Sequence, residues 1–192
     1  MSNNILKVLL RGFLNLTFRI KVLGEENIPK EGGVVVAVNH RSNWDPIIMG
    51  AVTKRSLRSI AKAELFKTKI GSWFFKALGA FPVERGKGDI GAVKTSLKLL
   101  ANGEALLIFP EGTRVKDERD VKAKTGAVMM ASHTDVPIIP VYISGKFSWM
   151  SKITVNFGPL IHIEKENGEK LSRERLQELS DSLMENIRQL KV

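Results

Sequence analysis

Three short, continuous apolar runs constrain this chain more than any other feature of its sequence. They occupy residues 34–38, 105–109 and 136–143. Each run is bounded by turn residues and is too short for a buried helix, which is typical of a strand buried on both faces. Segments with helical spacing of apolar residues, such as 89–101, lie between them. Strands that alternate with helices predict a single α/β domain with a mixed, mostly parallel central sheet flanked by helices.

The first run leads into Asn39-His40, and a turn then leads to Asp45-Pro46. Asp before Pro fits a helix N-cap followed by Pro at the first helical position. The four residues between His40 and Asp45 are enough to fold the carboxylate back toward the imidazole. A carboxylate on one ring nitrogen fixes the tautomer and leaves the other nitrogen free to take a proton. His40 and Asp45 are therefore candidate catalytic residues, although a structural histidine and a simple capping aspartate fit the spacing as well.

The sequence offers no obvious protein nucleophile to complete this pair. It contains no Cys, and it lacks the Gly-x-Ser-x-Gly turn of serine hydrolases. The attacking group can therefore be a hydroxyl of the substrate. The absence of Cys also excludes disulfides and thiolate metal sites, and it fits a reducing compartment.

Two further polar segments stand near the ends of predicted strands. The second apolar run ends in Pro110-Glu111-Gly112-Thr113-Arg114. Because sites in such sheets gather where strands end, we expect this segment to share a crevice with His40. Arg85 and Lys87 flank Gly86 in a glycine-rich loop, where backbone amides and cations can meet a phosphate. A solvated basic turn explains this loop equally well.

Charge favours anionic partners, because 30 Lys and Arg outnumber 20 Asp and Glu and give a net charge of +10. Residues 4–21 are apolar and basic, without an acid. Charges interrupt this segment too often for a transmembrane helix, and no signal-peptide cleavage pattern follows it. We expect an amphipathic helix that lies in the headgroup region of an anionic membrane or packs on the core. Residues 1–21 are accordingly assigned to membrane association and residues 22–192 to the catalytic domain.

The remaining apolar patterns predict further elements. Residues 64–78 carry more apolar side chains than one helix face needs, and most of them are expected to cover the core. The rest of this segment can line an apolar groove or meet lipid. The other expected elements are helices at 46–52, 122–132 and 176–190, and strands at 59–61, 153–157 and 160–163.

Four blocks occur in a fixed order along the chain. They are Asn39-His40 with Asp45, GAFPVERG at 79–86, FPEGTR at 109–114 and VPIIPV at 136–141. Together they resemble the glycerolipid acyltransferases, specifically the 1-acyl-sn-glycerol-3-phosphate acyltransferases. The His-x4-Asp spacing alone is weak, but with Phe-Pro-Glu-Gly-Thr-Arg further along it is highly specific. The resemblance covers roughly residues 20–160.

The resemblance implies transfer of a fatty acyl group from acyl-coenzyme A or acyl carrier protein to the free sn-2 hydroxyl of lysophosphatidic acid, giving phosphatidic acid. It implies His40 as general base and Asp45 as its orienting partner, with no metal and no organic cofactor. It also implies an enzyme at the cytoplasmic face of the cell membrane, either peripheral or monotopic. The residues implied in binding the acceptor are Arg85, Glu111, Gly112, Thr113 and Arg114.

Other functions remain open at this point. The same chemistry can serve another acceptor, such as glycerol-3-phosphate or another lysolipid, and water as acceptor would give hydrolysis. A peripheral lipid-binding protein of the same fold without activity is a different class, against which the presence of both His40 and Asp45 counts. Nucleic-acid binding is suggested by charge alone, and we expect none, because the basic residues are spread along the chain without a recognisable motif.

Overall fold

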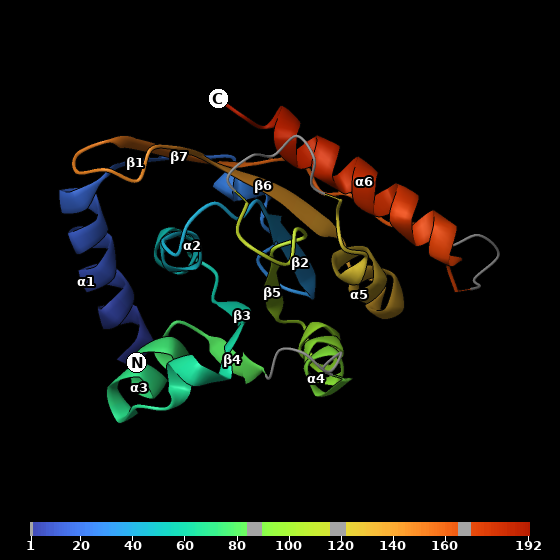
Figure 1. Ribbon diagram of the computed structural model, residues 1–192, viewed down its shortest axis with the longest axis horizontal. Helices are drawn as coiled ribbons and strands as arrows, with labels where there is room; N and C mark the ends of the chain where they lie inside the picture. The colour runs from blue at the N-terminus through green and yellow to red at the C-terminus, as the bar shows by residue number, and fades with distance from the viewer. Residues whose placement is uncertain (1, 84–89, 116–121, 165–169) are drawn as a thin grey trace.

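The computed structural model describes residues 2–83, 90–115, 122–164 and 170–192. Its centre is a seven-stranded sheet in the order β1-β7-β6-β2-β5-β3-β4 (Figure 1). All neighbouring strands are parallel except β6 and β7, which confirms the expected mixed, mostly parallel sheet. The strands are β1 (Arg19–Leu23), β2 (Val34–Val38), β3 (Leu57–Lys62), β4 (Ala80–Val83), β5 (Ala105–Ile108), β6 (Ile138–Gly145) and β7 (Lys152–Phe157). The helices are α1 (Ser2–Thr17), α2 (Asp45–Val52), α3 (Lys69–Ala77), α4 (Ile90–Ala101), α5 (Gly126–Thr134) and α6 (Arg173–Gln189), with short 3-10 turns η1 (Glu25–Asn27) and η2 (Ala63–Phe66).

Strand β2 lies in the middle of the sheet, and all five of its residues are buried. It pairs with β5 on one side and β6 on the other, so that Val36 lies opposite Leu107 and Ile139. Its residues are apolar on both faces because helices cover both faces of the sheet. Since all three strands run the same way, their C-terminal ends meet at one edge, where His40 follows β2.

Helices form one layer on each face of the sheet (Figure 1). Helices α1 and α2 cover the first face, where Leu14, Phe18 and Ile48 join the apolar core. Helices α4, α5 and α6 cover the second face through residues such as Leu100 and Ile187. Helix α2, strands β3 and β7, and helix α6 lie close to where the sequence predicts them.

Helix α1 ends at Thr17, before the end of the helix expected over residues 4–21. Phe18 is buried, and Arg19–Leu23 form the edge strand β1 beside β7. The prediction was wrong here because the strand alternates apolar and basic residues over only five positions, directly after an amphipathic helix. A boundary between residues 21 and 22 falls inside β1. Removing residues 1–21 therefore takes away core side chains and three of the five residues of an edge strand.

Residues 64–78 do not form the core-covering element that their composition predicts. They divide into η2 and α3, and no residue of α3 is buried. Ile70 is 80% exposed and Trp73 is 56% exposed. Helix α3 contacts the sheet through β4 and lies against α1 and η2, at the periphery of the fold. Its apolar residues therefore leave an exposed strip beside α1.

Two smaller expectations also need correction. Helix α5 begins at Gly126 rather than at residue 122, because residues 122–124 form no regular secondary structure and the Lys124 amide donates to the Pro110 carbonyl oxygen (2.8 Å). Residues 160–163 form only a single bridge, between Ile161 and Ile138, rather than a strand.

The placement of α1 predicts different roles for two of its leucines. Leu14 is fully buried, whereas Leu16 is 65% exposed. We expect Leu14→Ala to lower the free energy of unfolding by about 2–5 kcal/mol, the usual cost of a cavity in a packed core. The control Leu16→Ala should stay within about 0.5 kcal/mol of wild type in urea unfolding. Equal effects of the two substitutions would show that α1 is not part of the core.

Candidate active site

The centre of the candidate site is an ion pair between His40 and Asp45 at the C-terminal end of β2. His40 Nδ1 lies 3.0 Å from Asp45 Oδ2. The Asp45 carboxylate is fully buried, while the imidazole keeps a small exposed edge. A carboxylate accepts hydrogen bonds, so the proton of a neutral imidazole belongs on Nδ1 and Nε2 keeps its lone pair. The structure therefore brings the two predicted catalytic residues together in the expected order.

Asp45 does not cap helix α2, contrary to the sequence interpretation. The N-cap position is Trp44, and no side chain caps the helix start. Asp45 Oδ2 instead accepts from the amides of Arg41 (2.7 Å) and Ser42 (2.6 Å), which precede it in the chain. With the imidazole, three donors converge on this one oxygen atom. The carboxylate thus fixes the turn that carries His40 as well as the ring itself.

The segment after β5 holds His40 from a second direction. The Phe109 ring stacks on the imidazole, with centroids 4.1 Å apart and planes 22° from parallel. The buried Glu111 accepts a hydrogen bond at Oε1 from the His40 amide (3.0 Å). The amide of Val115 donates to the His40 carbonyl oxygen (2.8 Å). The segments that follow the first two strands therefore contact each other at His40, as the sequence predicts.

Strand β6 supplies a third set of contacts. The Asn39 side chain donates to the Ile143 carbonyl oxygen (3.2 Å) and accepts from the Ile143 amide (2.7 Å). Arg41 Nη1 donates to the Gly145 carbonyl oxygen (3.3 Å). Sequence reasoning gave no role to Asn39, Arg41 or Phe109. These contacts join residues far apart in the chain, so no local pattern predicts them. The one signal in the sequence is that the three residues lie in or beside the four blocks that resemble the acyltransferases.

The residues expected to bind the acceptor are not all brought to His40 in the same way. Glu111 is buried and bonded to the His40 backbone, whereas Thr113 and Arg114 are exposed. Gly112 adopts a positive φ of 69°, a conformation that glycine reaches without strain, so it shapes the turn between them. Arg85 lies outside the described residues.

Most amides of the turn after β2 are already used within the protein. Those of His40, Arg41 and Ser42 donate to carboxylates, as described above. The Trp44 amide donates to the Ser42 hydroxyl (3.2 Å), and the Asp45 amide donates to the Ser42 carbonyl oxygen (3.3 Å). Pro46 has no N–H. These groups therefore do not serve as donors to a developing oxyanion.

This arrangement is suited to removing a proton from a bound hydroxyl. An imidazole with one free nitrogen, oriented and stabilised in its protonated form by a buried carboxylate, is a general base. Within the described part of the chain, no three His, Cys, Asp or Glu side chains are grouped so that they could hold a metal ion. None of the described helices is both long and apolar enough to cross a membrane.

The sequence matches the model of the acyltransferase family over residues 19–144, which include His40, Asp45 and Glu111. The chain belongs to the acyltransferase family. It is 35% identical over 194 residues to a 1-acyl-sn-glycerol-3-phosphate acyltransferase of Bacillus subtilis (strain 168), covering 97% of this chain and 94% of that protein. It is 32% identical over 146 residues to the enzyme of that name from Streptococcus pneumoniae, covering 72% of this chain and 54% of that protein. The chain is therefore an O-acyltransferase.

The fold agrees with this assignment. The crystal structure of the 1-acyl-sn-glycerophosphate (LPA) acyltransferase PlsC from Thermotoga maritima superposes with a TM-score of 0.73. The match covers 98% of this acyltransferase and 80% of the other chain, at 24% sequence identity. At that identity the likeness supports the single α/β domain and its mostly parallel sheet.

The contacts of Asn39 predict that it holds the site together rather than only filling space. We expect Asn39→Ala to lower the free energy of unfolding by about 2 kcal/mol or more, because it leaves two buried backbone groups of Ile143 unpaired. Asn43→Ala is the matched control, since Asn43 lies in the same turn and is exposed. A urea midpoint that moves equally little in both variants would contradict this role.

Proposed function

We propose that this acyltransferase transfers a fatty acyl group from a thioester of coenzyme A or acyl carrier protein to the sn-2 hydroxyl of lysophosphatidic acid, forming phosphatidic acid. One observation carries the proposal: His40, bonded to the buried Asp45, is stacked on the first residue of Phe109-Pro110-Glu111-Gly112-Thr113-Arg114. The relatives that match most of the chain are named for this reaction. The product belongs to phospholipid biosynthesis.

In the proposed mechanism, His40 Nε2 takes the proton of the acceptor hydroxyl while its oxygen attacks the thioester carbonyl carbon. A tetrahedral oxyanion forms, and the imidazolium is stabilised by Asp45 on its other side. Collapse of this intermediate breaks the carbon–sulfur bond, and the imidazolium returns the proton to the departing thiolate. Such a positioned base contributes about 10²–10⁴-fold to the rate. The chain acts on both substrates without becoming acylated itself.

Recognition of the acceptor phosphate is assigned to cations beside this base. The exposed Arg114 and Thr113 follow the segment that holds His40, and Gly112 gives the turn its shape. Arg85 is assigned to the phosphate by the family resemblance. Glu111 acts as a positioning residue, because its carboxylate is bonded to the His40 amide. Guanidinium groups suit this role, since their forked donors match phosphate oxygens.

Both substrates are amphiphiles, and α1 is suited to the surface on which they lie. Four of its apolar side chains are exposed, and they lie at Val8, Leu9, Phe13 and Leu16. Burial lowers the pKa of the Lys7 ammonium, because the charged form loses hydration, and a lipid phosphate beside it offsets that cost. We assign α1 to the headgroup region of an anionic membrane, with peripheral or monotopic attachment at the cytoplasmic face.

The reaction is tested by incubating purified protein in detergent with lysophosphatidic acid and labelled palmitoyl-coenzyme A. We expect labelled phosphatidic acid, and none from His40→Ala, because this substitution removes the imidazole that takes the hydroxyl proton. His133→Ala is the matched control, since His133 is exposed on α5, and it should keep wild-type turnover.

The alternatives give different products in the same assay. Labelled free fatty acid would indicate hydrolysis. If neither palmitoyl-coenzyme A nor palmitoyl-acyl carrier protein gives product with lysophosphatidic acid, the acceptor is a different one, such as glycerol-3-phosphate or another lysolipid. Full activity in His40→Ala would refute the mechanism, provided its circular dichroism matches wild type.

The phosphate assignment makes a separate kinetic prediction. We expect Arg85→Ala to raise the KM for lysophosphatidic acid by about 10- to 100-fold, the cost of losing a charged hydrogen bond to the acceptor. The KM for the thioester should change little. Arg173→Ala, on the exposed start of α6, is the control for loss of one positive charge. An unchanged KM for the acceptor in Arg85→Ala would remove this residue from the phosphate site.

A further inference from the structure

Two distant stretches of the chain are basic without any acid. Residues 1–24 and 136–163 together contain six Lys and Arg residues and no Asp or Glu. The first stretch forms α1 and β1, and the second forms β6 and β7. Because β1 pairs with β7, the structure joins the two stretches at one end of the sheet. A surface of this composition is suited to an anionic partner.

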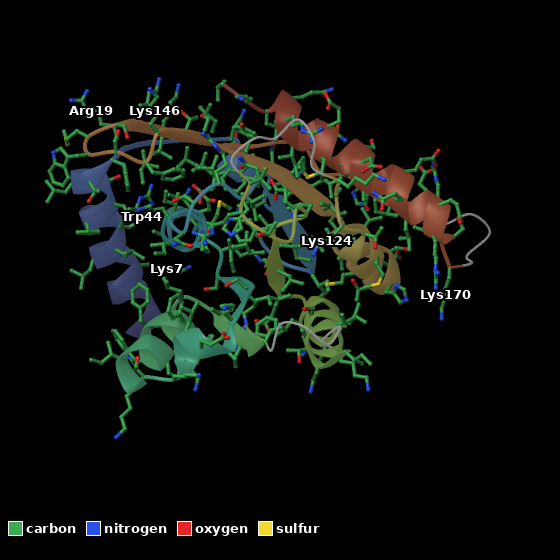
Figure 2. All side chains as sticks on the ribbon, viewed as in Figure 1. Lys7, Arg19, Trp44, Lys124, Lys146 and Lys170 are labelled. Atoms are coloured by element: carbon green, nitrogen blue, oxygen red, sulfur yellow. The ribbon has the colours of Figure 1, made fainter. Side chains whose placement is uncertain are left out.

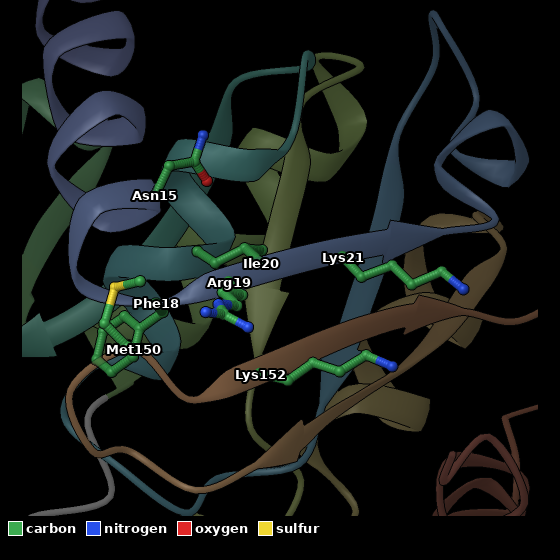
Figure 3. Close-up of a pocket in the computed structure, with 7 residues that line it drawn as sticks. All are labelled: Asn15, Phe18, Arg19, Ile20, Lys21, Met150 and Lys152. Carbon is green, nitrogen blue, oxygen red and sulfur yellow. The ribbon is translucent and has the colours of Figure 1, made fainter.

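Three of these cations lie on one face of the β1–β7 pair. Arg19 lies directly opposite Lys152 in the parallel register, and Lys21 follows two residues later on the same face (Figure 3). All three side chains are exposed, and they form no ion pair with a described carboxylate. Like charges directly opposite each other destabilise a sheet. This arrangement therefore destabilises the pair of strands unless an anion lies beside the three cations.

A hollow of about 560 Å³ opens beside these cations. Arg19, Lys21 and Lys152 line it together with the apolar side chains of Phe18 and Met150 (Figure 3). Cations on one side and apolar groups on the other match a ligand that is itself anionic at one end and apolar at the other. An inorganic ion or a uniformly acidic protein surface uses only the basic half of this hollow.

The turn between β6 and β7 exposes apolar side chains next to this hollow. Trp149 is 70% exposed and Met150 is 41% exposed. The Met150 amide donates to the Thr17 carbonyl oxygen (2.7 Å), and the Arg19 amide donates to the Ser151 carbonyl oxygen (2.9 Å), so the turn is fixed to the end of α1. Met150 adopts a positive φ of 58°, which is uncommon for a residue other than glycine. Exposed Trp beside Lys and Arg is typical of a membrane–water interface.

We propose that this hollow binds the phosphate headgroup of an anionic phospholipid in the bilayer, and that Trp149 enters the interface beside it. Arg19, Lys21 and Lys152 contact the phosphate, and Met150 lies along the glycerol and the start of the acyl chains. The site is separate from His40, because β6 and β7 stand between β2 and β1 in the sheet. At about 4.8 Å per strand, three steps place it roughly 14 Å away. The proposal rests on the proposed membrane association of this enzyme.

The position of the site has a consequence for catalysis. Strands β1 and β7 begin at the edge of the sheet where β2 and β6 end, as the pairing of Gly145 with Ile153 shows. Arg19 and Lys146 lie at the same corner of the molecule, above the end of α1 (Figure 2). Trp44, four residues after His40, contacts Phe18 of this hollow, and the two ring centroids lie 5.5 Å apart. A headgroup bound here therefore holds the sheet edge that carries His40 close to the lipid surface.

The charge contribution is tested with Arg19→Gln/Lys152→Gln, measured by sedimentation with phosphatidylcholine vesicles that contain phosphatidylglycerol. We expect the affinity for these vesicles to fall roughly 10- to 30-fold, because each of the two residues loses its electrostatic attraction to the anionic surface. The matched control Lys94→Gln/Lys98→Gln removes two exposed charges from α4 and should change affinity less than about twofold. Because the double variant relieves repulsion between β1 and β7, its unfolding midpoint should not fall.

Trp149 reports insertion directly. In Trp44→Phe/Trp73→Phe it is the remaining tryptophan, and brominated phospholipid in the vesicles should quench its fluorescence. Neither readout needs an acyl donor. If the wild type binds vesicles through Arg19 and Lys152 but forms no phosphatidic acid, the proposed reaction fails and this site stands.

Four results would overturn the proposal. Equal loss of binding in both charge variants would indicate general attraction, and an unquenched Trp149 would place the turn outside the interface. Release of the protein from vesicles by inorganic phosphate at constant ionic strength would show that the three cations bind the free ion. If Arg19→Gln/Lys152→Gln lost binding to acyl carrier protein but bound vesicles as wild type does, the three cations would form a site for the donor protein.

Discussion

The rest of the site depends on one buried oxygen atom, Asp45 Oδ2. It accepts from the imidazole of His40 and from the amides of Arg41 and Ser42. A buried carboxylate is costly unless it is paired and hydrogen-bonded, and these three donors offset that cost. Because two of them belong to the backbone, the same charge that orients the imidazole also fixes the turn that carries it. The short His-x4-Asp spacing follows from this geometry, since the carboxylate must reach back over its own turn.

The sheet makes this turn rigid by joining it to its neighbours on both sides. Asn39 bonds to β6, and the His40 amide bonds to Glu111 after β5. Three parallel strand ends are thereby joined at one edge, which is where sites of α/β sheets form. In the proposed mechanism, this rigid support lets His40 act on a substrate hydroxyl without a nucleophile from the protein. That mechanism further requires a surface that presents both substrates at this edge of the sheet.

The sequence predicts much of this, because the central strands are continuous apolar runs and the polar blocks follow them directly. It fails where the deciding contacts join distant residues. The stacking of Phe109 on His40 and the bond from Asn39 to β6 have no local signal. Strand β1 was missed because its alternation is short and follows an amphipathic helix. The exposure of Trp73 was missed because composition reports how apolar a segment is, but not whether the fold leaves a partner to cover it.

If His40 activates the hydroxyl of the acceptor directly, no acyl-protein forms during the reaction. The most direct measurement is the intact mass of the protein after incubation with palmitoyl-coenzyme A and no acceptor. We expect an unmodified mass and an intact thioester, and phosphatidic acid once lysophosphatidic acid is added. A stoichiometric palmitoyl adduct on a side chain near His40, such as Ser42, that transfers to the acceptor would contradict this mechanism.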